Sequence, residues 1–436
     1  MRLPDPDTTT IADLGAEMHG FASELFPLCR SITGDGLRET LRRIGTRVPL
    51  EIREVPTGSK VFDWTIPPEW NVRTAYVRNS RGENVVDFES NNLHLVGYSA
   101  PVSARMPLDE LRPRLTTIPE HPDWIPYRTS YYEETWGFCL SHNALLALDD
   151  GEYEVLVDST LAAGSLSYGE CYLAGEREDE VLISTHVCHP SLANDNLSGI
   201  VVATALAEFL ASLPRRLSYR FLFVPGTIGA IAWLHANREH VSRIAHGLVL
   251  TCVGDSGDTT YKRSRRGDAD IDRAVAHVLR HSGDDHVLID FSPDGYDERQ
   301  YCSPGFDLPV GCFMRTPHGQ FPEYHTSADD LDLIRPESLA DSFKKVLAAL
   351  SVVENDGVCV NLNPHGEPQL GRRGLFRSAG GRKRESIDER ALAWVLNLSD
   401  STNSLLDIAE RSRLEFHSVR AAADALLEHG LLEERA

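Results

Sequence analysis

Several features that mark particular classes of protein are missing from this sequence. Its eight cysteines are scattered and none forms a Cys-x-x-Cys pair, so neither a structural zinc ribbon nor a disulfide framework is expected. No apolar run approaches the roughly 20 residues that a membrane span needs. The first residues, MRLPDPDTTT, have neither the basic start nor the apolar core of a signal peptide. These absences predict a cytoplasmic protein.

Positive charge is also scarce. The 436 residues include 43 Lys or Arg against 65 Asp or Glu, which gives a formal net charge of −22. Such an excess of negative charge argues against a chain built mainly to bind nucleic acid or an anionic membrane. The length is enough for about two or three domains with a large core.

The pattern of apolar and polar residues changes along the chain and predicts an α/β protein. The N-terminal part, 11–45, has helical periodicity, whereas 49–100 consists of short alternating segments typical of strands. From 181 onward, buried-type strands alternate with helices, as in VLIST, LSGIVVATALAEFLASL and RLSYRFLFVPG. This alternation predicts a mixed, mostly parallel sheet with helices on both faces. Ligands of such sheets gather at the carboxyl ends of the strands.

The C-terminal part has a different composition. Residues 361–384 are rich in Gly, Pro and Arg and predict a linker, and three helical segments with a helix-turn-helix rhythm follow from 385. We therefore expect a small winged-helix-like domain. Residues 384–436 hold six Arg and eleven Asp or Glu, a net charge of −5, which would repel phosphate. The domain is thus predicted to contact protein, with a homo-oligomer as one outcome.

The stretch STHVCHPSLANDNLSG, 184–199, combines metal-ligand side chains with structure-forming signals. His186 stands at the carboxyl end of the predicted strand VLIST, and Asp195 comes just before a predicted helix. Histidine and carboxylate ligands, with one position open for water, are typical of catalytic zinc. Taken alone, His186 could equally end the strand and Asp195 cap the helix. His189 precedes a proline, which favours a loop or supporting role.

More polar clusters follow later in the chain. His325, within PEYHTSADDLDL, is a candidate for a distant third ligand, because a near pair of zinc ligands is often completed from far along the chain. The loop YDERQYCSPG contains Asp297, Glu298 and Arg299. These side chains are either simply solvated or supply a carboxylate base and a cation for the substrate.

Three other segments are candidates with a simple structural alternative. Asp255, in LTCVGDSGD, lies near the carboxyl end of a predicted strand, where a site is expected. Arg30, in CRSITGDG, either contacts a substrate head group or belongs to a turn between helices. The segment YKRSRRG, 261–267, has four positive charges and is either a solvated turn or an anchor for an anionic group.

These motifs, in this order, resemble the zinc aminopeptidase superfamily, which includes bacterial leucyl aminopeptidases and glutaminyl cyclases. The segments CRSITGDGLRETL, WGFCLS, THVCHPSLANDN, DERQYCSPG and YHTSADDLDLI are similar to a bacterial group of aminopeptidase-like proteins, often labelled as polysaccharide-biosynthesis proteins. The resemblance covers roughly residues 10–360, and the winged-helix-like tail also fits it.

The resemblance implies a role for each matching residue. His186, Asp195 and His325 would bind one zinc ion, with Asp195 as the central ligand that bridges two metals in dinuclear relatives. Asp255 matches the place where those relatives have a carboxylate for the second metal. His189, Arg30, Arg299 and Glu323 remain candidates for supporting or substrate-binding roles.

The predicted domains follow from the hydrophobic pattern together with the resemblance to the aminopeptidase-like group. They are an aminopeptidase-like α/β domain at 1–60 and 131–360, a small inserted β-rich domain at 61–130, the linker 361–384, and the winged-helix-like domain at 385–436.

Two residues depart from the pattern of the relatives. Many relatives have His-x-Asp, in which the Asp orients the histidine, but this chain has Cys188, which cannot hold an imidazole in the same charged way. The closer group has Pro-Glu-Thr after the next strand, whereas this chain has FVPGTIG, with Gly226 in place of the acid. Attack by metal-bound water normally needs a base within about 3 Å. Glu298 is the first candidate to replace it, and Asp297, Glu323 and Asp255 are alternatives.

The function expected from the resemblance is that of a zinc-dependent aminopeptidase-like hydrolase. Its substrate would be an amide-type bond in a small biosynthetic intermediate or a short peptide, and neither nucleic acid nor a membrane is an expected partner. One alternative is a metal-assisted cyclase or acyl-transfer enzyme, in which zinc only polarises a carbonyl. The other is a zinc-binding pseudoenzyme that acts as a binding module.

Overall fold

The computed structural model describes residues 8–375 and 387–435. Within them the chain divides into two compact units. The larger unit lies within 6–269 and 285–344, and the smaller within 270–284 and 345–436.

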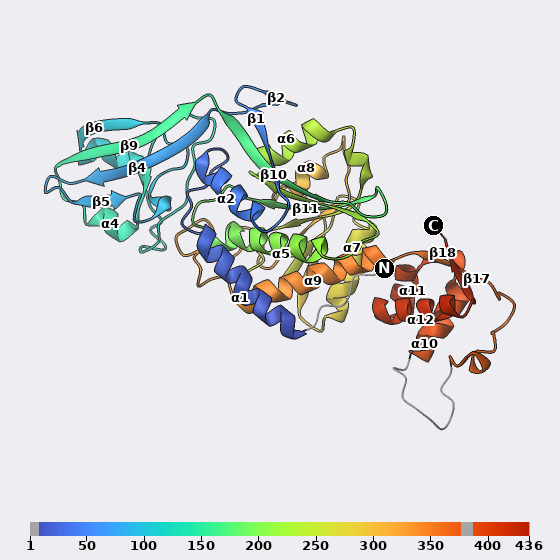
Figure 1. Cartoon of the computed structure of the whole chain (residues 1–436). Helices are drawn as coiled ribbons and strands as arrows, with labels where there is room; N and C mark the ends of the chain where they lie inside the picture. Colours follow the sequence, from blue (N-terminus) through green and yellow to red (C-terminus); the bar gives the residue numbers. More distant parts are fainter. Residues whose placement is uncertain (1–7, 376–386, 436) are drawn as a thin grey trace. The chain divides into compact units, whose positions relative to one another are not determined.

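An eight-stranded sheet forms the centre of the larger unit (Figure 1). The four strands in its middle run parallel to one another, and antiparallel neighbours flank them. In spatial order the strands are β1 (Glu51–Pro56), β10 (Ser165–Leu173), β12 (Ser218–Val224), β11 (Glu180–His186), β13 (Ile244–Leu250), β16 (Val310–Met314), β14 (Thr259–Lys262) and β15 (His286–Ile289). The expected mixed, mostly parallel sheet is confirmed.

Helices cover both faces of this sheet. Helix α5 (Gly199–Ala211) is almost entirely buried, because its apolar side chains contact the sheet on one side and other helices on the other. Helix α6 (Ile228–Asn237) lies on the opposite side of the sheet from α5 (Figure 1). The other long helices of the larger unit are α1 (Thr8–Leu25) and α2 (Asp35–Gly45). Helix α7 (Asp270–His281) belongs to the smaller unit, and α9 (Pro336–Asn355) begins in the larger unit and ends in the smaller. None of the helices in the described residues combines the length and apolar character that crossing a bilayer would need.

A separate four-stranded antiparallel sheet also belongs to the larger unit. Its order is β5 (Asn84–Asp87), β4 (Glu69–Arg78), β9 (Glu152–Ala162) and β6 (Val102–Pro107). Strand β9 alternates buried and half-exposed residues, which is typical of a strand with one covered face. The sheet therefore takes a strand from beyond the predicted insertion 61–130, and the boundaries proposed for that insertion stay a prediction.

Short elements connect these parts. They are β2 (Lys60–Val61), β3 (Trp64–Thr65), β7 (Leu115–Thr116), β8 (Phe138–Cys139), α3 (Leu108–Leu111), α4 (His142–Leu146), the π-helical turn η3 (Ala193–Ser198), α8 (Glu298–Tyr301), and the 3-10 turns η1 (Asn92–His94), η2 (Arg112–Arg114), η4 (Val241–Arg243) and η5 (Gly371–Arg373).

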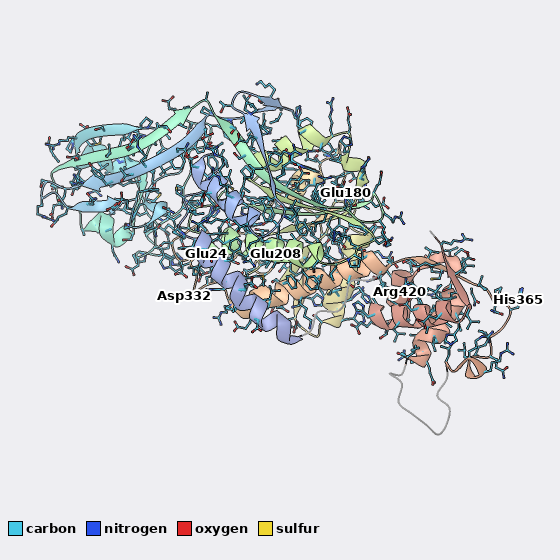
Figure 2. The ribbon with its side chains drawn as sticks, viewed as in Figure 1. Glu24, Glu180, Glu208, Asp332, His365 and Arg420 are labelled. Atoms are coloured by element: carbon cyan, nitrogen blue, oxygen red, sulfur yellow. The ribbon has the colours of Figure 1, made fainter. Side chains whose placement is uncertain are left out.

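The smaller unit contains the expected winged helix. Helices α10 (Glu389–Leu398), α11 (Leu405–Ser412) and α12 (Phe416–Glu428) pack with a three-stranded sheet of β18 (Asp400–Ser404), β17 (Val358–Asn361) and β19 (Leu432–Glu434). The buried side chain of Arg420 pairs with Asp424 and Glu434, which fixes β19 against α12 (Figure 2). Strand β17 thus joins this fold although the sequence assigns most of it to the preceding domain.

A buried cluster of charges links three neighbouring strands of the large sheet. Arg220 on β12 has its Nε 2.6 Å from Glu180, the first residue of β11, and it also pairs with Glu170 on β10. All three side chains are largely excluded from solvent, and Glu180 is labelled in Figure 2. Removal of the cation would leave the buried carboxylate of Glu180 without its ion pair and that of Glu170 with Arg53 at 4.0 Å.

We therefore expect Arg220→Ala to lower the free energy of unfolding by about 3 kcal/mol, because uncompensated buried charges are costly. The matched control is Arg73→Ala, which breaks the exposed pair that Arg73 forms with Asp158 on the small sheet. Exposed pairs contribute little, so the control should unfold almost like the wild type. Denaturant unfolding followed by tryptophan fluorescence measures both, and equal effects of the two changes would contradict this account.

Candidate metal centre

The carboxyl ends of the parallel strands carry the predicted metal ligands. Strand β11 ends at His186, and the chain then passes through His189 to Asp195 in η3, just before α5. His325 comes from the loop between β16 and α9, at a positive φ of 57°. The structure brings these residues together, although 130 positions separate Asp195 from His325.

The carboxylate of Asp195 is the centre of the site. Its Oδ1 lies 2.9 Å from Nε2 of His186. Its Oδ2 lies 3.0 Å from Nε2 of His325 and 3.3 Å from Nδ1 of His189. Asp195 and His186 are fully buried and His189 is nearly so. Two histidines from one strand end and one from a distant loop thus surround a single carboxylate.

Several polar atoms of this cluster are buried without a hydrogen bond. Among the described residues they include Oδ2 of Asp195, Nδ1 of His186, Nε2 of His325 and Nε2 of His318. Buried polar groups are almost always hydrogen-bonded, so a concentration of unbonded ones indicates a missing partner. Imidazole nitrogens and a carboxylate oxygen are ligands that suit zinc. The residues present therefore fit a bound metal ion.

The protonation states also suit a cation. Burial opposes ionisation of Asp195, but His189, His186 and His325 outweigh it and hold the pKa of this carboxyl well below its usual range. Burial lowers the pKa of the His186 imidazole from its ordinary 6.5 to about 3. At neutral pH the site thus contains a carboxylate anion and a neutral imidazole, which are the forms that bind metals.

The ligand atoms form two overlapping sets around Asp195. Ligand atoms of His186, His189 and Asp195 all lie within 4.8 Å of one another, and so do those of Asp195, Cys252 and His318. His325 approaches the carboxylate oxygen opposite to the one that His186 contacts. The predicted single ion held by His186, Asp195 and His325 is therefore one of several arrangements that the cluster could support.

Sequence reasoning missed Cys252 and His318. Cys252 comes two residues after β13 and His318 four residues after β16, and Nδ1 of His318 lies 3.6 Å from Sγ of Cys252. The rule that places sites at the carboxyl ends of parallel strands applies to both residues. Asp255 lies near the same strand end and was the residue predicted from this rule.

Asp255 supports the site from outside rather than lining it. One of its oxygens accepts a hydrogen bond from the side-chain amide of Asn194 at 2.7 Å, and the other accepts from the hydroxyl of Thr316 at 2.9 Å. Both oxygens are therefore used, and the second-metal role implied for Asp255 is not what these contacts favour. Asp255 instead holds Asn194, the residue directly before Asp195.

Asp329 and Arg30 fix the loop that carries the ligands. The carboxylate of Asp329 accepts hydrogen bonds from the backbone N–H groups of Asn194 at 2.6 Å and Asp195 at 3.0 Å. Buried Arg30 donates from Nε to the carbonyl oxygen of His189 at 2.8 Å. Arg30 thus acts on the backbone of the site, and the substrate contact considered for it stays a prediction.

The two acids of the DERQY loop, Asp297 and Glu298, are both buried, and Glu298 is not free to act as the predicted base. Glu298 is buried, its Oε1 lies 2.9 Å from Nζ of Lys262, and its oxygens accept the N–H of Tyr296. A carboxylate engaged in this way is poorly placed to take a proton, so the geometry argues against Glu298 as the base. Neither oxygen of buried Asp297 has a hydrogen bond, and burial raises the pKa of this carboxyl well above its usual range.

Two predicted side chains remain without partners. Neither the guanidinium of Arg299 nor the carboxylate of Glu323 forms a hydrogen bond or ion pair with any other side chain in the described part of the chain. The basic run 261–267 differs, because its cations are paired with acids, as Arg263 is with Asp290 and Arg265 with Asp307. The solvated-turn interpretation therefore fits only the later part of the run, because Tyr261 and Lys262 are buried at the end of β14 and Lys262 pairs with buried Glu298.

Comparison with known sequences places this centre in a family. The family described as "Domain of unknown function (DUF4910)" matches 19–356, and a winged helix-turn-helix family matches 357–434. A protein of Clostridium acetobutylicum, provisionally named a polysaccharide biosynthesis protein with an aminopeptidase-like domain, is 53% identical over 97% of both chains. The chain belongs to this aminopeptidase-like family.

Solved structures agree with this assignment. A crystal structure of a provisionally named peptidase from C. acetobutylicum shares 51% identity, covers 98% of both chains and gives a TM-score of 0.94. A zinc aminopeptidase from Bacillus subtilis shares only 13% identity, covers 80% of this chain and 95% of its own, and gives a TM-score of 0.58. The second comparison shows that the aminopeptidase-like protein has the zinc aminopeptidase fold.

The aminopeptidase-like site has Cys188 and Gly226 at the two positions where the resemblance implies acids. Nδ1 of His186 has no partner, because Cys188 points its sulfur toward the hydroxyl of Tyr296, 3.5 Å away. The Tyr296 ring lies over the His186 imidazole, with 3.8 Å between centroids and an angle of 32° between the ring planes. It also fills the space beside Gly226, where an added Cβ would collide with it. A bulky phenol thus occupies the place expected for an acid.

The pKa of His186 predicts acid sensitivity of the metal-free protein. The unfolded chain binds a proton at this imidazole below about pH 6.5, whereas the folded chain does not until about pH 3. The contribution of His186 to stability should therefore fall as the pH drops through this window, by up to about 1.4 kcal/mol per pH unit for one proton. The lowered pKa of Asp195 acts in the same direction. Asp329, whose pKa burial raises to about 8, contributes with the opposite sign, so the effect of His186 is read from the difference between the wild type and a variant without this imidazole.

Urea unfolding of the chelator-treated protein at several pH values between 7.5 and 4.5 measures this slope. The control is His186→Gln, which removes the titrating group and should reduce the slope by about one proton. Identical slopes for the two proteins would show that His186 is not buried in its neutral form.

Proposed function

We propose that this chain is a zinc-dependent, aminopeptidase-like hydrolase that cleaves an amide-type bond in a small biosynthetic intermediate or a short peptide. The observation that carries the proposal is the buried carboxylate of Asp195. Its Oδ1 contacts His186, and its Oδ2 lies near His325 but accepts no hydrogen bond, so this oxygen is available to a metal ion. The relative's name, which combines polysaccharide biosynthesis with an aminopeptidase-like domain, supports a biosynthetic substrate.

The donor atoms support zinc and are consistent with one ion. His186, His189 and Asp195 offer three ligand atoms within 4.8 Å of one another, which leaves a fourth position for water or substrate. His325 approaches Oδ2 of Asp195, as His189 does, and is the alternative third ligand beside His186 and Asp195. When bound, zinc polarises a carbonyl and lowers the pKa of bound water. A second ion would need Cys252 and His318 to share the same carboxylate.

Hydrolysis needs a proton acceptor, and this chain has to supply it from a position other than 226. Position 226 offers no side chain, Glu298 is paired with Lys262, and burial raises the pKa of the Asp297 carboxyl well above its usual range, which disfavours the anion that a base needs. Glu323 remains, because its carboxylate has no partner in the described structure and it lies two residues before His325. We assign the role of general base to Glu323, and that of a buried proton donor to Asp297.

A second function has one specific observation in its favour. The Tyr296 ring covers His186 and fills the space beside Gly226, so the centre could hold a metal without performing hydrolysis. The chain would then be a metal-dependent binding module. Two sets of variants separate the hydrolase from this alternative.

The first set tests the base. Glu323→Gln should lower the turnover of aminoacyl p-nitroanilides and acyl-amino acids by about 100-fold or more, the usual contribution of a general base, while zinc content is unchanged. Asp195→Asn should lose zinc as well as turnover. Glu298→Gln is the matched acid-to-amide control. It should lower the free energy of unfolding, because Lys262 loses its partner, and should change the turnover rate much less than Glu323→Gln does. Full activity of Glu323→Gln would remove Glu323 from the mechanism.

The second set tests the scaffold. Gly226→Glu alone should disrupt the site, because its side chain would collide with Tyr296. Combined with Tyr296→Ala, the new acid has room, and hydrolysis should rise by about tenfold or more over Tyr296→Ala alone if the site is that of a hydrolase. A well-folded, zinc-loaded double variant with no gain would favour the binding module instead.

A further inference from the structure

A small pocket lies beside the metal centre and is not explained by metal binding. Its volume is about 250 Å³, and it is lined by aromatic and aliphatic side chains with one charged group, Arg299. Pockets for drug-sized ligands are roughly 300–1,000 Å³, so this one suits a single ring with a short substituent.

Arg299 is unusual among the half-buried arginines of this protein. Arg38, Arg47 and Arg315 each lie within 3.0 Å of a carboxylate oxygen. By contrast, no hydrogen bond or ion pair holds the Arg299 guanidinium in the described part of the chain, and its Nε is buried without a hydrogen bond. Burial raises the pKa of Asp297, the charge of Arg299 acts to lower it, and the oxygens of Asp297 also lack hydrogen bonds. A guanidinium in this state is prepared to bind a carboxylate from outside, because its planar fork matches that group with two hydrogen bonds.

Two aromatic side chains that line the pocket are exposed to solvent. Trp64 is 45% exposed and Tyr132 is 53% exposed, although large aromatic side chains are usually covered. Their ring centroids are 5.5 Å apart. Tyr132 has a φ of 67°, which is uncommon for a bulky residue. Exposed aromatic faces beside a cation provide stacking surface for a flat ring or for the C–H face of a sugar.

Two sets of contacts connect the pocket with the metal centre. Tyr296 lines the pocket, and its ring also lies over the imidazole of His186. Tyr131 also lines the pocket, and its hydroxyl lies 3.1 Å from that of Tyr127, whose ring contacts His189 and His325 at centroid distances of 5.2 and 5.0 Å. A ligand seated against Arg299 would therefore extend toward the metal ligands.

We propose that this pocket binds a ring-bearing carboxylate as the recognition group of the substrate, with Arg299 holding the carboxylate and Trp64 and Tyr132 covering the ring. This inference rests on the proposed function, since it names the class of substrate for the same centre. Two sources share the chemistry, namely an acidic sugar such as a uronic acid and an amino-acid derivative with an aromatic ring.

Direct binding tests the proposal without requiring turnover. Glucuronate and N-acetylphenylalanine are titrated into the full-length protein by calorimetry, each beside its uncharged counterpart, glucose or N-acetylphenylalaninamide. At least one carboxylate should bind about tenfold or more tightly than its counterpart, the usual scale of a charge-assisted pair. Which acid shows the preference identifies the source.

Variants place the binding in the pocket. Arg299→Gln should remove the preference for the carboxylate, Arg299→Lys should retain part of it, and Trp64→Ala should weaken binding of both members of a pair. Arg73→Gln, on the outer face of the small sheet, should bind like the wild type. Thermal unfolding verifies that each variant is folded.

The inference and the proposed function fail in different ways. If neither acid is preferred over its neutral counterpart, or if folded Arg299→Gln keeps the preference, the pocket assignment is wrong whatever the activity. If Asp195→Asn binds the acid like the wild type but the wild type turns over no amide of that acid, the pocket assignment stands and the hydrolase is wrong.

Discussion

A single buried anion, the carboxylate of Asp195, imposes the arrangement of everything around it. A charge in a dry interior is costly unless it has partners, and here histidines supply them at both oxygens. Asp329 lies close by, and burial raises its pKa to about 8, so at neutral pH the proton resides on Asp329 and not on Asp195. Two neighbouring acids thus have opposite protonation states, set by their different surroundings.

Tyr296 connects the features that distinguish this site. Its ring covers His186, its hydroxyl meets the sulfur of Cys188, and its edge fills the space left by Gly226. The same side chain lines the pocket that contains Arg299. One residue therefore contacts a metal ligand on one side and lines the pocket on the other, and it also meets both positions, 188 and 226, where the resemblance implies acids.

The sequence predicted the part of the site that depends on local pattern. His186 follows from an apolar run that ends where a parallel strand ends, and Asp195 from the polar turn before a helix; with the motif order, the α/β fold and winged helix followed too. Cys252 and His318 were not found, because loops that come together only in the folded chain bring them to Asp195. The pairing of Glu298 with Lys262, 36 residues earlier, is likewise invisible in a linear pattern. Contacts between loops that lie far apart in the sequence leave no periodic pattern from which they could be predicted.

The fit between Gly226 and Tyr296 also has a consequence for the history of the family. Because a side chain at 226 and a tyrosine at 296 need the same volume, neither position could change freely while the other stayed as it is. A lineage that passes from an acid at 226 to glycine gains a void, and a tyrosine at 296 closes it; the reverse path requires the tyrosine to leave first. Across relatives the two positions should therefore vary together, so that an acid at the first accompanies a small residue at the second.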